Sequence, residues 1–203
     1  GRTTYSDWIM GMLPEKSGYK DGKAGFYDIG ASFSHTFNKY HKLNIYGYYS
    51  RDRFAFNDNE KYGYGNMNIS AHWRAIFSER FMANFSAGYD HYDYKNDESA
   101  DSVQAARLSF NIDQYFAKAN FNLTLEKHKL NFGASTMMYN IGAGTYEPLG
   151  NLSIVAYDEL QKDKALESAV YVGEEWEVTP KLSLNAGIRY SMFNAMGPRN
   201  YYT

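Results

Sequence analysis

The sequence predicts an all-β protein, a fragment of an antiparallel transmembrane β-barrel with about eight long strands in four hairpins. Three observations carry this prediction. Apolar and polar residues alternate over runs of about 13 or 14 residues. Short polar turns join these runs in pairs, and longer connections join one pair to the next. Long strands with short turns at one end and long loops at the other are typical of outer-membrane barrels.

The four short turns are expected at residues 38–42, 78–80, 126–129 and 179–181. The connections at the opposite end are expected over residues 57–62, 96–102 and 144–164. Because short turns lie on the periplasmic side of such barrels, both ends of the chain are expected outside the cell. A complete even-stranded barrel keeps both ends in the periplasm. We therefore expect residues 1–203 to be a partial barrel domain without plug and remaining strands, and residues 1–23 to be a loop or partial strand.

The first two hairpins are expected to contain strands 24–37, 43–56, 64–77 and 81–95. One face of each strand is apolar and the other polar, which is the period of two that a sheet requires. In chain order, the apolar faces carry Ile29 and Phe33, Leu43 and Ile45, Ile69 and Trp73, and Phe81 and Phe85. Runs of this length rise roughly 30 Å at a tilt of ~45°, enough to cross an outer membrane. A soluble strand averages only about five or six residues.

The second half is expected to contain strands 103–125, 130–142, 165–178 and 182–196. The first of these changes phase, because Leu108 and Phe110 lie on even positions whereas Phe121 and Leu123 lie on odd ones. We interpret this change as a β-bulge at 113–118, which re-aims the apolar face. The final strand has the clearest alternation of the sequence.

The composition favours a barrel over a soluble domain. The chain has 20 tyrosines and 18% aromatic residues, yet its mean hydropathy is −0.59. A barrel accommodates both values, because only alternate residues face lipid and aromatic rings concentrate at the membrane boundaries. The net charge of −2 gives no global attraction to nucleic acid, and the absence of cysteine excludes disulfides and thiolate metal sites. No apolar run is long enough for a transmembrane helix.

One hairpin, residues 169–190, carries a specific pattern. An acidic residue and a tryptophan, Glu175 and Trp176, precede a short turn, and the next strand reads L-x-L-x-x-G-x-R-Y from Leu182 to Tyr190. This hairpin resembles that of TonB-dependent outer-membrane receptors, and segment 129–135 is similar to the strand before it. The continuation Gly197-Pro198 resembles Bacteroidetes members of the family.

The resemblance implies a large barrel closed by an N-terminal plug, with energised uptake of a scarce nutrient such as a siderophore, haem or glycan. The location implied is the outer membrane of a Gram-negative bacterium. The partners implied are outer-membrane lipid and, through the parent protein, the plug and TonB complex, with a surface lipoprotein as a further candidate. Two alternatives stay open: a complete small eight-stranded structural or adhesion barrel, and a soluble all-β binding module.

Outward-pointing aromatic residues near the long-loop end are the candidate ligand contacts, because aromatic faces stack on sugars, haem or siderophores. The candidates are Tyr62, Tyr64, Tyr92, Tyr94, Tyr139 and Tyr146, with Tyr89 nearby. For any single residue, an aromatic girdle at the membrane boundary is the competing interpretation. The long connection 144–164 is the best candidate loop for ligand or partner contact.

Neither catalytic nor metal chemistry is predicted. The five histidines show no metal-ligand spacing, and no nucleophile motif is present. The acidic stretch from Asp90 to Glu98 is expected to be a solvated tip rather than a cation site, and Glu174, Glu175 and Glu177 are expected to pair with cations such as Arg189. We expect no enzyme activity, no cofactor, no metal site and no nucleic-acid partner.

Overall fold

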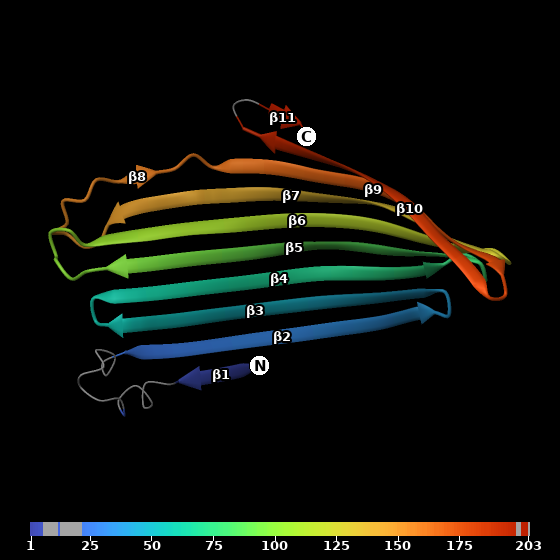
Figure 1. Ribbon diagram of the computed structural model, residues 1–203. Coiled ribbons are helices and arrows are strands. Elements are labelled where there is room, and N and C mark those ends of the chain that lie inside the picture. Colours follow the sequence, from blue (N-terminus) through green and yellow to red (C-terminus); the bar gives the residue numbers. More distant parts are fainter. Residues whose placement is uncertain (6–11, 13–21, 198–199, 203) are drawn as a thin grey trace.

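The chain folds as a single antiparallel sheet, as a computed structural model shows (Figure 1). The structure describes residues 1–5, 12, 22–197 and 200–202. The strands are β1 (Arg2–Tyr5), β2 (Lys23–Asn38), β3 (His41–Asn57), β4 (Glu60–Ile76), β5 (Phe81–Glu98), β6 (Ala106–Thr124), β7 (His128–Pro148), β8 (Asp158–Glu159), β9 (Asp163–Thr179), β10 (Leu182–Met196) and β11 (Asn200–Tyr202). Neighbours in the sheet follow the chain order, except that β9 pairs with β7 and the short β8 pairs only with β7.

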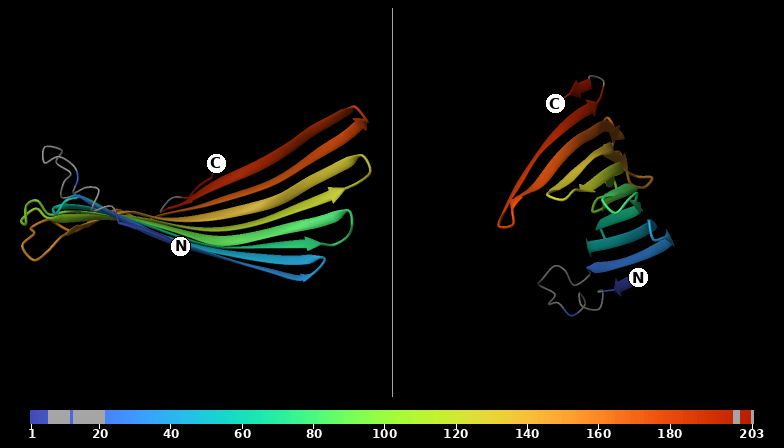
Figure 2. Two further views of the ribbon diagram at one scale, coloured as in Figure 1. Left: turned by 90° about the horizontal axis from the view of Figure 1, so that it is seen from below. Right: turned by 90° about the vertical axis from the view of Figure 1, so that its right-hand side faces the viewer.

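The predicted fold class and hairpins are confirmed. The eight long strands contain between 15 and 21 residues, somewhat more than the sequence pattern indicated. They form the four predicted hairpins β2–β3, β4–β5, β6–β7 and β9–β10. Figure 2 shows that the sheet is strongly twisted and that its first and last strands lie far apart, so the described sheet is open.

The N-terminal region contributes one short strand to this sheet. Arg2–Tyr5 forms β1 and pairs with β2, with Arg2 opposite Asp28. The guanidinium of Arg2 donates to the Asp28 carboxylate at 2.8 Å. The segment 8–13, expected to be a loop or part of a strand, lies outside the described residues except for Met12.

The short turns are held by side chains that accept hydrogen bonds from the backbone. Asn38 Oδ1 accepts from the amides of Tyr40 and His41 at 2.8 and 3.0 Å. Ser78 Oγ accepts from the amide of Phe81 at 3.1 Å, and Thr179 Oγ1 accepts from the amide of Lys181 at 3.3 Å. Asn, Ser and Thr favour turns for this reason, which explains why the sequence marked these positions.

Two of the three connections at the other end are shorter than predicted, and the third is displaced along the chain without a change in length. Between β3 and β4 only two residues, 58 and 59, lie outside the strands, because Asn57 Oδ1 accepts from the Asn59 amide at 2.9 Å and closes a tight turn. The expected loop 96–102 begins only after Glu98. The expected loop 144–164 is partly strand, since β7 continues to Pro148 and β8 pairs with it.

The bulge expected at 113–118 is wrong. β5 and β6 pair without interruption from Phe81 opposite Leu123 to Glu98 opposite Ala106. The irregularity lies in β7 instead, where the register with β6 shifts between Ser109 and Asn111. Gly144 stands in this bulge with φ of +152°, a conformation that L side chains rarely adopt.

The register, including its shift in β7, assigns every paired strand residue to one of two faces. We call the face that carries Ile69, Ala71 and Trp73 of β4 the belt face, and the face that carries Tyr64 and Asn66 the tyrosine face. Near the short turns, the belt face exposes an apolar band over all eight long strands. Examples with their exposed fractions are Phe33 (57%), Ile69 (53%), Val170 (54%) and Ile188 (72%).

The interior of this fold contains only small side chains. The buried apolar residues among those described are all alanines, including Ala75, Ala83 and Ala169, and no large side chain is fully buried. Within the described ranges, no helix is long and apolar enough to cross a membrane. A single sheet therefore exposes its large apolar residues, and soluble monomers rarely expose a continuous patch of this extent.

The phase change in β6 has a simple cause. Phe121 and Leu123 lie on the belt face within the apolar band, whereas Leu108, Phe110 and Ile112 lie on the tyrosine face nearer the long loops. At that level the belt face carries charged residues instead. The apolar residues therefore change face along an unbroken strand.

Candidate ligand-contact face and polar network

Aromatic side chains of three neighbouring strands meet on the tyrosine face near the long-loop end. Tyr64 of β4, Tyr94 of β5 and Phe110 of β6 lie opposite one another in the register. The ring centroids are 5.3 Å apart for Tyr64 and Tyr94, and 4.7 Å apart for Tyr94 and Phe110. Tyr92 contacts Phe110 diagonally at 6.0 Å. These spacings are typical of favourable ring pairs.

The register places all six predicted ligand-contact residues on the tyrosine face. They are Tyr62 and Tyr64 of β4, Tyr92 and Tyr94 of β5, and Tyr139 and Tyr146 of β7. The first four come together. Tyr146 lies in the same cross-strand row as Tyr62, whereas Tyr139 lies apart and donates to Glu167 Oε2 at 3.3 Å. These six share the face opposite the apolar band, whereas Tyr89 lies on the belt face.

Two tyrosines of this face, Tyr62 and Tyr94, have a raised pKa. The Tyr62 hydroxyl donates to the Glu60 carboxylate. This hydrogen bond, together with desolvation, raises the pKa of Tyr62 to about 12. Burial likewise raises the pKa of Tyr94. The surface thus offers ring faces and hydroxyl groups, which suit stacking and hydrogen bonding to a ligand.

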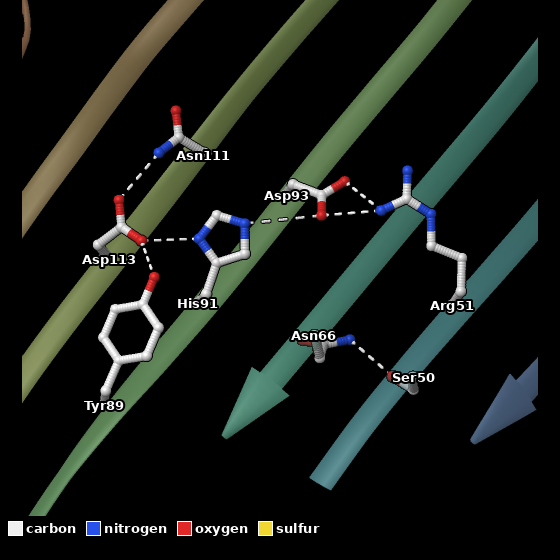
Figure 3. A network of polar contacts seen from close by, with 8 residues as sticks. All are labelled: Ser50, Arg51, Asn66, Tyr89, His91, Asp93, Asn111 and Asp113. Carbon is white, nitrogen blue, oxygen red and sulfur yellow. Dashed lines mark hydrogen bonds and ion pairs between the residues drawn. The ribbon is translucent and has the colours of Figure 1, made fainter. Parts of the chain in front are cut away.

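A polar network lies on the belt face at the end of the apolar band (Figure 3). Asp113 accepts three hydrogen bonds, from the Tyr89 hydroxyl at 2.5 Å, from His91 Nδ1 at 2.7 Å in the tautomer that protonates it, and from Asn111 Nδ2 at 3.1 Å. The other ring nitrogen of His91 lies 3.7 Å from Asp93. The network therefore connects β5 and β6 through side chains as well as through the backbone.

The same network reaches β3 across an intervening strand. Arg51 of β3 donates to both carboxylate oxygens of Asp93 of β5 at 2.8 and 2.9 Å, passing over Gly65 of β4. A Cβ at Gly65 would lie 2.3 Å from Asp93 Oδ1 and 2.7 Å from the Arg51 guanidinium. The glycine therefore leaves the space that this ion pair occupies.

Sequence reasoning did not identify this network. The alternation Tyr89-x-His91-x-Asp93 places three polar side chains on one face of a strand, and this spacing is the signal that was available. The acidic stretch expected to be a solvated tip is strand, and two of its carboxylates form ion pairs, Asp93 with Arg51 and Asp97 with Arg107.

A second ion pair joins the strands nearer the loops. Arg107 of β6 donates to both carboxylate oxygens of Asp97 of β5 at 2.6 and 2.8 Å, and it lies 3.7 Å from Glu147 of β7. The hydrogen bond from Arg107 lowers the pKa of Asp97 below its usual value, against the opposing effect of desolvation. The bidentate geometry is the strong form of this contact.

Stability should depend on pH through Asp97. Because its pKa is lower in the folded state, its contribution is complete above the unfolded pKa near 4 and is lost as pH falls through the folded value. We expect Asp97→Asn to reduce the free energy of unfolding by about 1 kcal/mol at pH 7 and by little at pH 3. Denaturant unfolding at both pH values measures this difference.

The control is Asp158→Asn, which removes an exposed carboxylate that forms no ion pair in the described part of the chain. An equal loss for Asp97→Asn at both pH values would contradict the expected linkage.

The remaining titratable residues of interest are dispersed. His35 stacks on Phe33 and meets Phe37 edge to face, and His72 contacts Ser86 Oγ at 2.9 Å. Among the described residues, no group of three or more histidines and carboxylates could hold a metal ion.

The expected pairing of the acidic group with Arg189 is wrong. Glu174 pairs with His128 at 2.5 Å and Glu175 with Lys129 at 2.9 Å. Arg189 donates to Ser191 at 3.2 Å instead. These pairings follow from the register, because β9 lies between β7 and β10.

The long antiparallel strands, the apolar band and the alternating faces place the chain in the class of β-barrel proteins. The family model described as "TonB dependent receptor-like, beta-barrel" matches residues 7–202. The chain therefore belongs to this family, which agrees with the resemblance of hairpin 169–190. No curated protein matches the sequence.

Solved structures share the fold at low sequence identity. The ferripyoverdine receptor of the outer membrane of Pseudomonas aeruginosa matches with a TM-score of 0.71 and 11% identity over 90% of this chain and 32% of that one. The ferric-catecholate import receptor Fiu of E. coli K12 matches with a TM-score of 0.69 and 9% identity over 88% and 38%. The ferric preacinetobactin receptor BauA of Acinetobacter baumannii matches with a TM-score of 0.66 and 13% identity over 88% and 35%. The chain thus spans about a third of the length of these receptors.

Proposed function

We propose that this chain forms part of the wall of a TonB-dependent outer-membrane transporter that takes up a nutrient such as a siderophore, haem or glycan. The observation that carries the proposal is the division of the sheet into two faces. The belt face exposes a continuous apolar band that suits lipid, and the tyrosine face presents polar residues and clustered aromatic rings that suit an aqueous lumen. The names of the iron-complex receptors that share the fold support this substrate class.

The proposal assigns partners to each part of the protein. Residues 1–203 act as a partial barrel domain, and outer-membrane lipid of a Gram-negative bacterium, of Bacteroidetes type, surrounds the belt face. The plug and the TonB complex act through the whole receptor, and a surface lipoprotein is a further proposed partner at the long-loop end. The chain provides binding and containment rather than enzymatic catalysis. Gly197-Pro198, which suggested the Bacteroidetes origin, lies partly outside the described residues.

The aromatic cluster should contribute directly to ligand affinity. We expect Tyr94→Ala, which removes the central ring of the cluster, to weaken ligand binding by about tenfold, the value of one lost ring contact of ~1.4 kcal/mol. The experiment measures cellular uptake and equilibrium binding for a panel of ferric siderophores, haem and oligosaccharides. The ligand that the receptor accumulates is expected to enter only when TonB is present.

The matched control is Tyr115→Ala, which removes an exposed tyrosine of the belt face from the strand next to Tyr94. This variant should retain ligand affinity. Uptake that persists without TonB would reject the transporter assignment. Equal effects of the two substitutions would show that the tyrosine face does not contact the ligand.

A further inference from the structure

A basic hollow lies on the belt face where the apolar band ends. It has a volume of about 520 Å³ and is formed by β1 to β4. The belt-face side chains around it include four cations, Lys23, Arg51, Arg53 and Lys61, together with Tyr27. Among the described residues that line the hollow there is no carboxylate.

Two of these cations form no ion pair within 4 Å in the described part of the chain. Arg51 is bound to Asp93 at 2.8 Å, and Lys23 lies 3.3 Å from the exposed Asp58. Arg53 and Lys61 are exposed; Lys61 lies opposite Asp97 in the register, but the Asp97 carboxylate is bound by Arg107. The hollow therefore carries an excess of positive charge, and Gly25 and Ala55 in its lining are small residues that leave space above the sheet.

The position of the hollow matches the level of lipid headgroups. From Phe77 to Met67, ten residues of extended chain cover about 33 Å, which a tilt of ~40° converts to a height of about 25 Å. This height equals that of the apolar band of outer-membrane barrels. Arg51 lies in the next row of belt-face residues beyond Met67, on the side of the longer connections, which such barrels turn to the cell exterior.

We propose that the basic hollow binds the phosphate of a lipid headgroup in the outer leaflet, while the acyl chains of that lipid lie along the apolar band. Charge complementarity and direct continuity with the band carry this assignment. Tyr27 lines the hollow and Tyr49 lies opposite Met67 at the end of the band, with ring centroids 5.9 Å apart, and tyrosine favours this boundary. The inference rests on the membrane placement of the proposed function, but not on the identity of the transported ligand.

The experiment compares lipids that differ only in phosphate. The delipidated receptor in neutral detergent is titrated with phosphatidic acid or with diacylglycerol of the same acyl chains, and retained lipid is measured by native mass spectrometry. The receptor should retain phosphatidic acid at least tenfold better. Each surface cation contributes about fivefold to such binding, so Arg53→Gln combined with Lys61→Gln should weaken it roughly thirtyfold.

The control is Arg74→Gln combined with Lys118→Gln, which removes two exposed cations from the tyrosine face and should leave lipid retention unchanged. Equal retention by both double variants, or equal retention of the two lipids, overturns the proposal. Displacement of phosphatidic acid by millimolar inorganic phosphate also overturns it, because the site then takes a free anion. If the receptor retains phosphatidic acid selectively but shows no TonB-dependent uptake, only the proposed transporter function is rejected.

Discussion

Replacing Val170 by arginine is expected to lower the free energy of unfolding in a bilayer by about 2–4 kcal/mol, the cost of a cation at the midplane of the lipid-facing surface. Val170 lies on the belt face of β9 with an exposed fraction of 54%. Its neighbours on the belt face, Val172 of β9 and Ile188 and Tyr190 of β10, are also apolar or aromatic and exposed. Reversible denaturant unfolding in phospholipid vesicles measures the loss.

The matched control is Ser191→Arg, in the strand that pairs with Val170. Ser191 lies opposite Ala169 on the tyrosine face and is exposed. There an arginine remains in water, so the free energy of unfolding should change by only about 0.5 kcal/mol. If the two variants lose equal stability, the belt face does not contact lipid and the soluble all-β alternative gains support.

The difference between these two neighbouring positions is already present in the sequence. Strict alternation identifies the faces near the short turns, because one face must be apolar there and a slip by one residue would reverse every side chain. The short turns were equally predictable, since Asn38, Ser78 and Thr179 accept hydrogen bonds from amides within their own turns. Both features depend on residues close together in the chain.

Features that depend on distant residues were not predictable from the pattern. The change of phase in β6 indicated a bulge, but Phe110 and Phe121 lie on opposite faces of an unbroken strand, because the apolar residues change face where the band ends. The contact of Arg51 with Asp93 joins residues 42 positions apart and crosses a third strand. Alternation within single strands contains no information on such contacts.

Glycines lie beneath long side chains at two places in this sheet. Each of them allows a side chain to form a hydrogen bond with a strand that is not its direct neighbour. Arg51 crosses Gly65, and the Tyr171 hydroxyl donates to Asn120 Oδ1 at 2.6 Å while crossing Gly133 of β7. In both cases a side chain from one strand reaches the second strand along. A glycine at such a position lowers the local strand propensity but leaves space for the cross-strand contact.

Gly133→Ala is therefore expected to destabilise the protein by about 1–3 kcal/mol, the usual cost of overpacking. The new Cβ would lie 2.3 Å from the carbonyl oxygen of Ala119 and 2.8 Å from the Tyr171 hydroxyl. The backbone oxygen belongs to a paired strand and cannot move without disturbing the ladder. Denaturant unfolding of the folded barrel measures the loss.

Gly47→Ala provides the opposite expectation within the same sheet. Gly47 lies in β3, and a Cβ added there meets nothing within 4 Å. Alanine loses less conformational freedom on folding than glycine, so this variant should be neutral or more stable by about 0.5–1 kcal/mol. The two substitutions have identical chemistry and differ only in what lies above the glycine. Equal tolerance of both would mean that the side-chain crossing over Gly133 does not constrain the sheet.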